Sequence, residues 1–189
     1  MSNFSMKSNK TYRLTAYGLM TALAFVSNYI RFPFLGSQIA ISNGLCVLCG
    51  MILGPLAGFV TAGIGNFLYD LIAGYGIEGL ITLVSKGAIA LIAGLICFRQ
   101  MKKGKLEKND YPLLVLGAAA GAAAYIALYM LKTYVLGITV KGLGPEGAVA
   151  SLLSKLPASA INAVFAAIAA PALAAAVHLP LHKLGVLEK

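Results

Sequence analysis

Long apolar runs set the tightest limit on how this chain can fold. Runs close to twenty residues long recur along its 189 residues, and only 11% of the residues are charged. A typical soluble domain carries about 25% charged residues. Each run can cross a bilayer core of roughly 30 Å, and most runs lack the alternation of barrel strands. The sequence therefore predicts an all-α integral membrane protein.

The expected architecture is one membrane domain over residues 1–189 with six transmembrane helices. The approximate spans are 12–30, 39–53, 55–73, 78–98, 112–136 and 147–178. Pro55 suits the first turn of the third span, because the N–H that proline lacks would be unpaired there. Pro171 is expected to kink the last span or to break it into two pieces.

The distribution of basic residues predicts the orientation in the membrane. They cluster before the first span, after the fourth and near the C-terminal end: Lys7, Lys10, Arg13, Arg99, Lys102, Lys103, Lys105, Lys108, Lys183 and Lys189. With six spans, all ten fall on one side, which the positive-inside rule makes cytoplasmic. Both termini are then cytoplasmic, in a multi-pass protein of the bacterial cell membrane. The net charge of +9 is thus a topology signal, and no stacking or basic-groove pattern indicates nucleic acid.

Polar side chains inside the spans gather in their outer halves. Lys86, within "ITLVSKGAIALIAGLICF", lies roughly 12 Å deep, where a charge costs on the order of 3 kcal/mol. The other predicted binding residues at this depth are Asn66, Tyr69, Asp70, Tyr125, Tyr129, Lys132, Lys155 and Asn162. Asp70 is the only carboxylate among them. It is therefore expected near Lys86, directly or through water or a ligand.

The inner halves of the same spans, such as "AIALIAGLI", are nearly bare of polar groups. A channel needs polar groups along its full length, and a secondary transporter usually binds near the midplane. The pattern instead predicts a polar site open to the outside above an apolar plug. The alternative is that each polar side chain is satisfied separately in the bundle or reaches the headgroups.

Enzyme and cofactor motifs are absent from the sequence. It contains no GxxxxGK[ST], no HExxH and no paired-carboxylate constellation, so neither an enzyme nor a cofactor is expected. Cys46 and Cys49 have CxxC spacing but no second ligand pair, which predicts packing residues and no metal site. The rival classes are an intramembrane enzyme and a stand-alone facilitator, and the dry inner halves argue against the facilitator.

Several motifs resemble the substrate-binding S components of energy-coupling factor (ECF) vitamin transporters, from about Arg13 to His182. They are "LTAYGLMTALAF", "ISNGLCVLCGMILGPLAGFVTAGIGNFLYDLIAG", "LVSKGAIALIAGL" and "SKLPASAIN". The resemblance implies six helices with both termini inside and a vitamin bound near the extracellular face. It also implies that the loop "RFPFLGSQ" closes over the vitamin. The partners would be a membrane coupling protein and two ATPase subunits.

Small residues on the first span would form the docking face for the coupling protein. Gly18 and Ala22 have the spacing that lets helices approach closely in lipid. The surplus of lysines over Asp70 favours a ligand with a carboxylate, a phenolate or many acceptors. A pyridoxine-like or hydroxymethylpyrimidine-like ring is the first choice. Riboflavin, pantothenate and cobalamin stay open.

Overall fold

The computed structural model describes residues 10–34, 37–76 and 78–183, and within them the chain forms six α-helices and one β-hairpin. The helices are α1 (Lys10–Val26), α2 (Ser42–Leu53), α3 (Pro55–Ile72), α4 (Glu78–Met101), α5 (Tyr111–Thr139) and α6 (Pro145–Lys183). Two short 3-10 turns, η1 (Ser27–Tyr29) and η2 (Lys108–Asp110), precede the hairpin and α5. The predicted all-helical membrane fold is confirmed. Lys7 and Lys189, two of the basic residues that predict the orientation, lie outside the described residues.

Helix lengths agree with a membrane protein. Four helices in the described part of the chain, α3 to α6, are long and apolar enough to cross a bilayer, and α2 is apolar but only 12 residues long. The helices begin and end within a few residues of the predicted spans. That six segments cross the membrane with both termini inside stays a prediction.

The hairpin was not predicted. Strands β1 (Arg31–Phe34) and β2 (Ser37–Ala40) pair antiparallel, where the sequence had suggested a closing loop and the first residues of the second span. α1 stops at Val26 and not at residue 30, because η1 turns the chain into β1. Each strand has four residues and β1 contains Pro33, which an edge strand tolerates. A pattern this short carries no detectable alternation.

α2 is the centre of the bundle. Eleven of its twelve residues are buried, so the other elements cover it around its whole circumference. Glycines let the neighbouring helices approach it: a Cβ added at Gly50 would overlap the carbonyl of Ala90 on α4. Gly54, with φ of 88°, then turns the chain directly into α3, which begins at Pro55.

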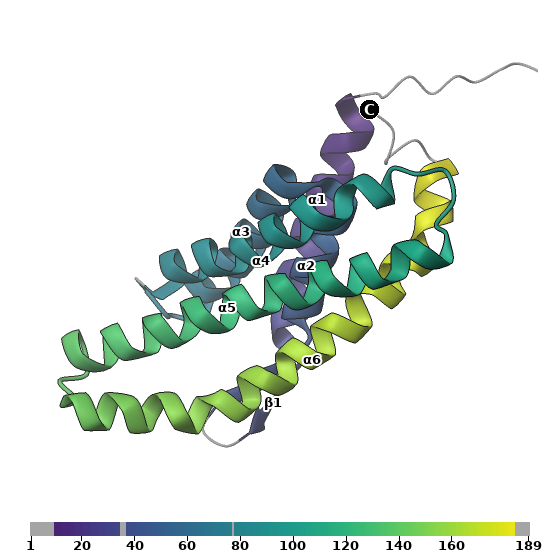
Figure 1. Ribbon diagram of the computed structural model, residues 1–189. Helices are drawn as coiled ribbons and strands as arrows, with labels where there is room; N and C mark the ends of the chain where they lie inside the picture. The colour runs from purple at the N-terminus through teal and green to yellow at the C-terminus, as the bar shows by residue number, and fades with distance from the viewer. Residues whose placement is uncertain (1–9, 35–36, 77, 184–189) are drawn as a thin grey trace, which may run out of the picture.

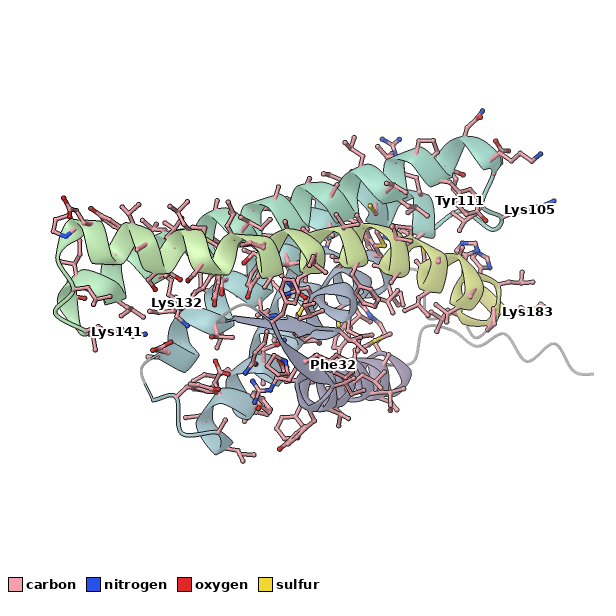
Figure 2. The ribbon with its side chains drawn as sticks, turned by 90° about the horizontal axis from the view of Figure 1, so that it is seen from below. Phe32, Lys105, Tyr111, Lys132, Lys141 and Lys183 are labelled. Atoms are coloured by element: carbon pink, nitrogen blue, oxygen red, sulfur yellow. The ribbon has the colours of Figure 1, made fainter. Side chains whose placement is uncertain are left out.

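α5 and α6 lie side by side as a long antiparallel pair that runs past the shorter helices (Figures 1 and 2). α6 is one helix of 39 residues and contains Pro157, Pro171 and Pro180. Of the two outcomes expected at Pro171, a kink or a break, the break does not occur. The ribbon instead bends toward its yellow end in Figure 1, as prolines inside a helix allow.

Candidate functional site

A polar cavity of about 450 Å³ lies at one end of the bundle. It is built where α3 ends, α4 begins, and the α5–α6 connection brings the end of α5 beside the start of α6. The hairpin and the first residues of α2 complete its wall. The lining residues are Asn28, Arg31, Gln38, Ala40, Ser42, Asn43, Tyr69, Asp70, Tyr75, Glu78, Thr82, Lys86, Tyr125, Tyr129, Lys132, Thr133, Leu136, Lys141, Ser151, Lys155, Ser159 and Asn162. Eight of the nine predicted binding residues are among them.

Asn66 is the predicted residue that does not line this cavity. It is 1% exposed and donates from Nδ2 to the Ala62 carbonyl (2.8 Å) and to Cys46 Sγ (3.3 Å). Asn66 lies one helical turn before Asp70 on α3, and this turn packs against α2 beneath the cavity. The spacing of Asn66 and Asp70 is regular, but their depths differ.

Lys86 is 7% exposed and is held by neutral groups. Its Nζ donates to Ser42 Oγ (2.9 Å) and to Asn43 Oδ1, both at the start of α2. The same ammonium lies 4.8 Å from the centre of the Tyr125 ring. Among the described residues, the structure shows no ion pair between Lys86 and a carboxylate. Asp70 shares the cavity wall with Lys86, so water or a ligand would have to connect them.

Two tyrosines on α5 connect Lys86 with a second lysine. The rings of Tyr125 and Tyr129 stack with centres 5.6 Å apart and an 18° angle between their planes. Lys155 of α6 places its Nζ 5.8 Å from the Tyr129 ring centre. An ammonium over an aromatic face gains about 0.5–2 kcal/mol, depending on how far it is desolvated. The rings thus hold two ammoniums in the wall while leaving their charge uncompensated.

Lys132 has a partner that the sequence argument missed. Its Nζ lies 3.0 Å from Glu78 Oε2, and the two side chains are 13% and 39% exposed. Glu78 opens the predicted fourth span but was not among the predicted binding residues; it begins α4 and lines the cavity. The lining contains five basic residues (Arg31, Lys86, Lys132, Lys141, Lys155) and two acidic ones (Asp70, Glu78), so three positive charges remain.

The hairpin supplies further lining residues. Arg31 donates to Gln38 Oε1 (2.8 Å) across the two strands, and its guanidinium lies 4.8 Å from the Tyr69 ring centre. Asn162 of α6 is hydrogen-bonded to the backbone of β2. Ser42 and Asn43 could have been found from "ISN", which opens the second apolar run, but they carry no charge and no periodic pattern.

The opposite end of the bundle contains the basic loop between α4 and α5. Lys105 and Lys183 lie at this end in Figure 2, and Lys132 and Lys141 at the cavity end. His178 is buried there, with Nε2 within hydrogen-bonding distance of the carbonyls of Met101 (3.2 Å) and Lys103 (2.9 Å). This histidine is far along α6 from the cavity lining.

Comparison with known proteins assigns the chain to a family. The family model for the ECF-type riboflavin transporter, S component, matches residues 8–179. The chain belongs to this S-component family. A solved structure titled "Structure and mechanism of the S component of a bacterial ECF transporter" aligns with a TM-score of 0.62 and 17% identity. The alignment covers 96% of this S component and 100% of that chain, and it shows the shared fold.

Two relatives carry no functional name. An uncharacterized protein in the gap 3' region of Pyrococcus woesei is 31% identical over 137 residues, covering 71% of this S component and 82% of that protein. A UPF0397 protein of Vibrio atlanticus is 28% identical over 91 residues, covering 47% of this S component and 50% of the relative. The predicted resemblance is confirmed: this S component is an integral membrane, vitamin-binding subunit of an ECF transporter, and the family is not an enzyme family.

Proposed function

We propose that this S component captures a flat, acceptor-rich, water-soluble vitamin from outside the cell and carries it into an ATP-driven ECF importer. The observation that supports this most is the cavity wall, in which the ammoniums of Lys86 and Lys155 flank two stacked tyrosines. Ring faces favour a flat ligand, and uncompensated ammoniums favour acceptor atoms or negative charge. The cavity volume of about 450 Å³ falls at the small end of ordinary ligand pockets.

Two kinds of ligand satisfy this description for different reasons. Riboflavin is favoured by the family model, and its fused ring offers carbonyl acceptors to the lysines. A pyridoxine-like or hydroxymethylpyrimidine-like ring is favoured by the charges. A phenolate would face Lys86 or Lys155, and a ring N–H⁺ would face Asp70. Pantothenate lacks the flat ring, and cobalamin is much larger than riboflavin, so both fit the cavity less well.

The binding test begins with the protein as purified. Mass spectrometry of material released from the detergent-extracted, heat-denatured protein should find one of these vitamins at close to one molecule per chain. Calorimetry on ligand-depleted protein then compares riboflavin, pyridoxine, hydroxymethylpyrimidine, pantothenate and cobalamin. If no vitamin co-purifies and none of the five binds, the proposed function is wrong.

α1 is the proposed docking surface for the membrane coupling protein, which would be carried by two ATPase subunits. Gly18 and Ala22 are both exposed, and a Cβ added at Gly18 would meet no atom within 4 Å. The close approach of another helix would therefore meet no obstacle from this chain. Gly18→Leu should leave vitamin binding unchanged while lowering uptake and complex assembly. Full uptake by this variant would remove α1 from the interface.

A further inference from the structure

The side chain of Asn162 joins helix α6 to strand β2. Its Oδ1 accepts a hydrogen bond from the Ala40 N–H (2.8 Å), and its Nδ2 donates to the Gln38 carbonyl (2.9 Å). Asn162 is only 7% exposed. Both polar atoms of the carboxamide therefore have backbone partners more than a hundred residues away in the sequence.

This contact imitates the pairing of two strands. The hydrogen-bonding groups of successive strand residues alternate between the two edges of the strand. Just beyond β2, Ile41 donates from its N–H to the Ile30 carbonyl (3.4 Å), so the odd-numbered residues of β2 direct these groups toward β1. Gln38 and Ala40 direct theirs to the other edge, where the Asn162 carboxamide takes the place of a third strand.

The contact fixes one side of the cavity. Three hairpin residues line it, namely Arg31 on β1 and Gln38 and Ala40 on β2. β1 is held by β2 through their pairing, and β2 is held by α6 through Asn162. The Asn162 side chain thus hydrogen-bonds this wall to the helix that also carries Lys155.

We propose that Asn162 is a positioning residue for the substrate: it holds the hairpin at the cavity and acts through β2, without binding the vitamin itself. Only the expected effect of Asn162 on vitamin affinity rests on the proposed function. The anchoring itself is a property of the ligand-free protein. A wall held in place before binding loses less conformational entropy when the vitamin enters.

Amide hydrogen exchange at Ala40 tests the anchor directly. In Asn162→Leu, which keeps a similar volume, the Ala40 amide should exchange about tenfold faster in ligand-free protein, because it has lost its acceptor. Ser154→Ala is the matched control, since this exposed α6 hydroxyl bonds only to the Ser151 carbonyl of its own helix. It should leave Ala40 exchange unchanged.

Vitamin binding supplies the second measurement. Whichever of riboflavin and pyridoxine binds the wild-type protein should bind Asn162→Leu about tenfold more weakly, and Asn162→Gln, which keeps both polar groups, should recover part of the loss. Weaker binding with unchanged Ala40 exchange would mean that Asn162 contacts the vitamin, and would overturn the proposal.

Exchange at the Ala40 amide is informative in two further cases. If Asn162→Leu does not fold, the exchange rate in the ligand-free wild-type protein tests the anchor instead. An Ala40 amide that exchanges as fast as a solvent-exposed amide would overturn it. If neither vitamin binds the wild-type protein, the proposed ligands fail, while the exchange result still stands for or against the anchor.

Discussion

The two ends of the helical bundle hold their charged side chains in different ways. At the cavity end, Lys132 pairs with Glu78, but Lys86 and Lys155 are held by hydroxyl, amide and aromatic groups, with no carboxylate partner among the described contacts. At the opposite end, Lys103 forms an ion pair with Asp110, and His178 contacts one backbone carbonyl at the end of α4 and one just after it.

This difference separates groups that stabilise the fold from groups available to a ligand. At the basic end, partners within the protein neutralise a charge and form hydrogen bonds with backbone carbonyls. Neutral partners at the cavity end satisfy the donor geometry of an ammonium and leave its charge free to attract an anion or a carbonyl. The helices between the two ends pack through small residues and contain no such unpaired charge among their described residues.

The largest expected effect lies in the packed centre. Gly50→Ala places a methyl group against the Ala90 carbonyl. Overpacking of this kind costs about 3 kcal/mol, which exceeds the gain of about 1 kcal/mol from replacing a helical glycine. We therefore expect the unfolding free energy to fall by about 2 kcal/mol. Unfolding can be followed with a thiol-reactive dye, because Cys46, Cys49 and Cys97 are all buried and free in the folded protein.

Gly18→Ala is the matched control for the packed centre. It also replaces a helical glycine, but its new methyl group meets no atom within 4 Å. Its stability should be equal to that of the wild type or higher by up to about 1 kcal/mol. Equal stability of the two variants would show that α2 and α4 do not approach as closely as the structure indicates.

A reciprocal pair of substitutions compares the two ends. His178→Ala removes the partner of two backbone carbonyls and should lower stability by about 1 kcal/mol, with vitamin affinity unchanged. Lys155→Ala should weaken vitamin binding about threefold to tenfold and leave stability nearly unchanged, because its ammonium contacts only a ring face. Thermal unfolding and calorimetry on both variants check this. A loss of vitamin affinity in His178→Ala would contradict the assignment of stabilising groups to one end and binding groups to the other.

The smallest effect is expected at the ion pair beside the cavity. Lys132 and Glu78 are partly exposed, so Glu78→Gln should change stability by less than about 1 kcal/mol. The freed lysine should strengthen binding of an acidic vitamin at low salt, and added salt should remove the gain. Binding of a neutral vitamin should not change. A weaker affinity for both kinds of ligand would mean that Glu78 itself contacts the ligand.

The helices and the location of the polar residues could be predicted because apolar runs and buried charges leave strong signals in a sequence. Lys86, Tyr125, Tyr129 and Lys155 stood out in this way, and all four line the cavity. The partner of Lys132 could not be predicted, because Lys132 and Glu78 lie on different helices and only the tertiary packing brings them together.

The hairpin and its anchor could not be predicted either. Two strands of four residues are too short for a recognisable period, and Asn162 meets β2 only through tertiary structure. Asn66 shows the opposite error. It shares a regular spacing with Asp70, but one helical turn of depth places it in the core, where α2 covers it. Periodicity predicts the face of a helix and not the depth of a cavity.

The most direct test of the central claim is the comparison of Lys86→Met with the wild-type protein, with melting temperature and vitamin affinity measured on the same sample. Methionine keeps most of the aliphatic volume and removes the ammonium. Because Ser42 and Asn43 are neutral, no buried charge is left unpaired; they lose only a hydrogen-bond donor, at a cost of about 1 kcal/mol, so the melting temperature should fall by only a few degrees. Affinity should fall at least about tenfold, or about 1.4 kcal/mol. Unchanged affinity would contradict the claim that this buried lysine serves the substrate.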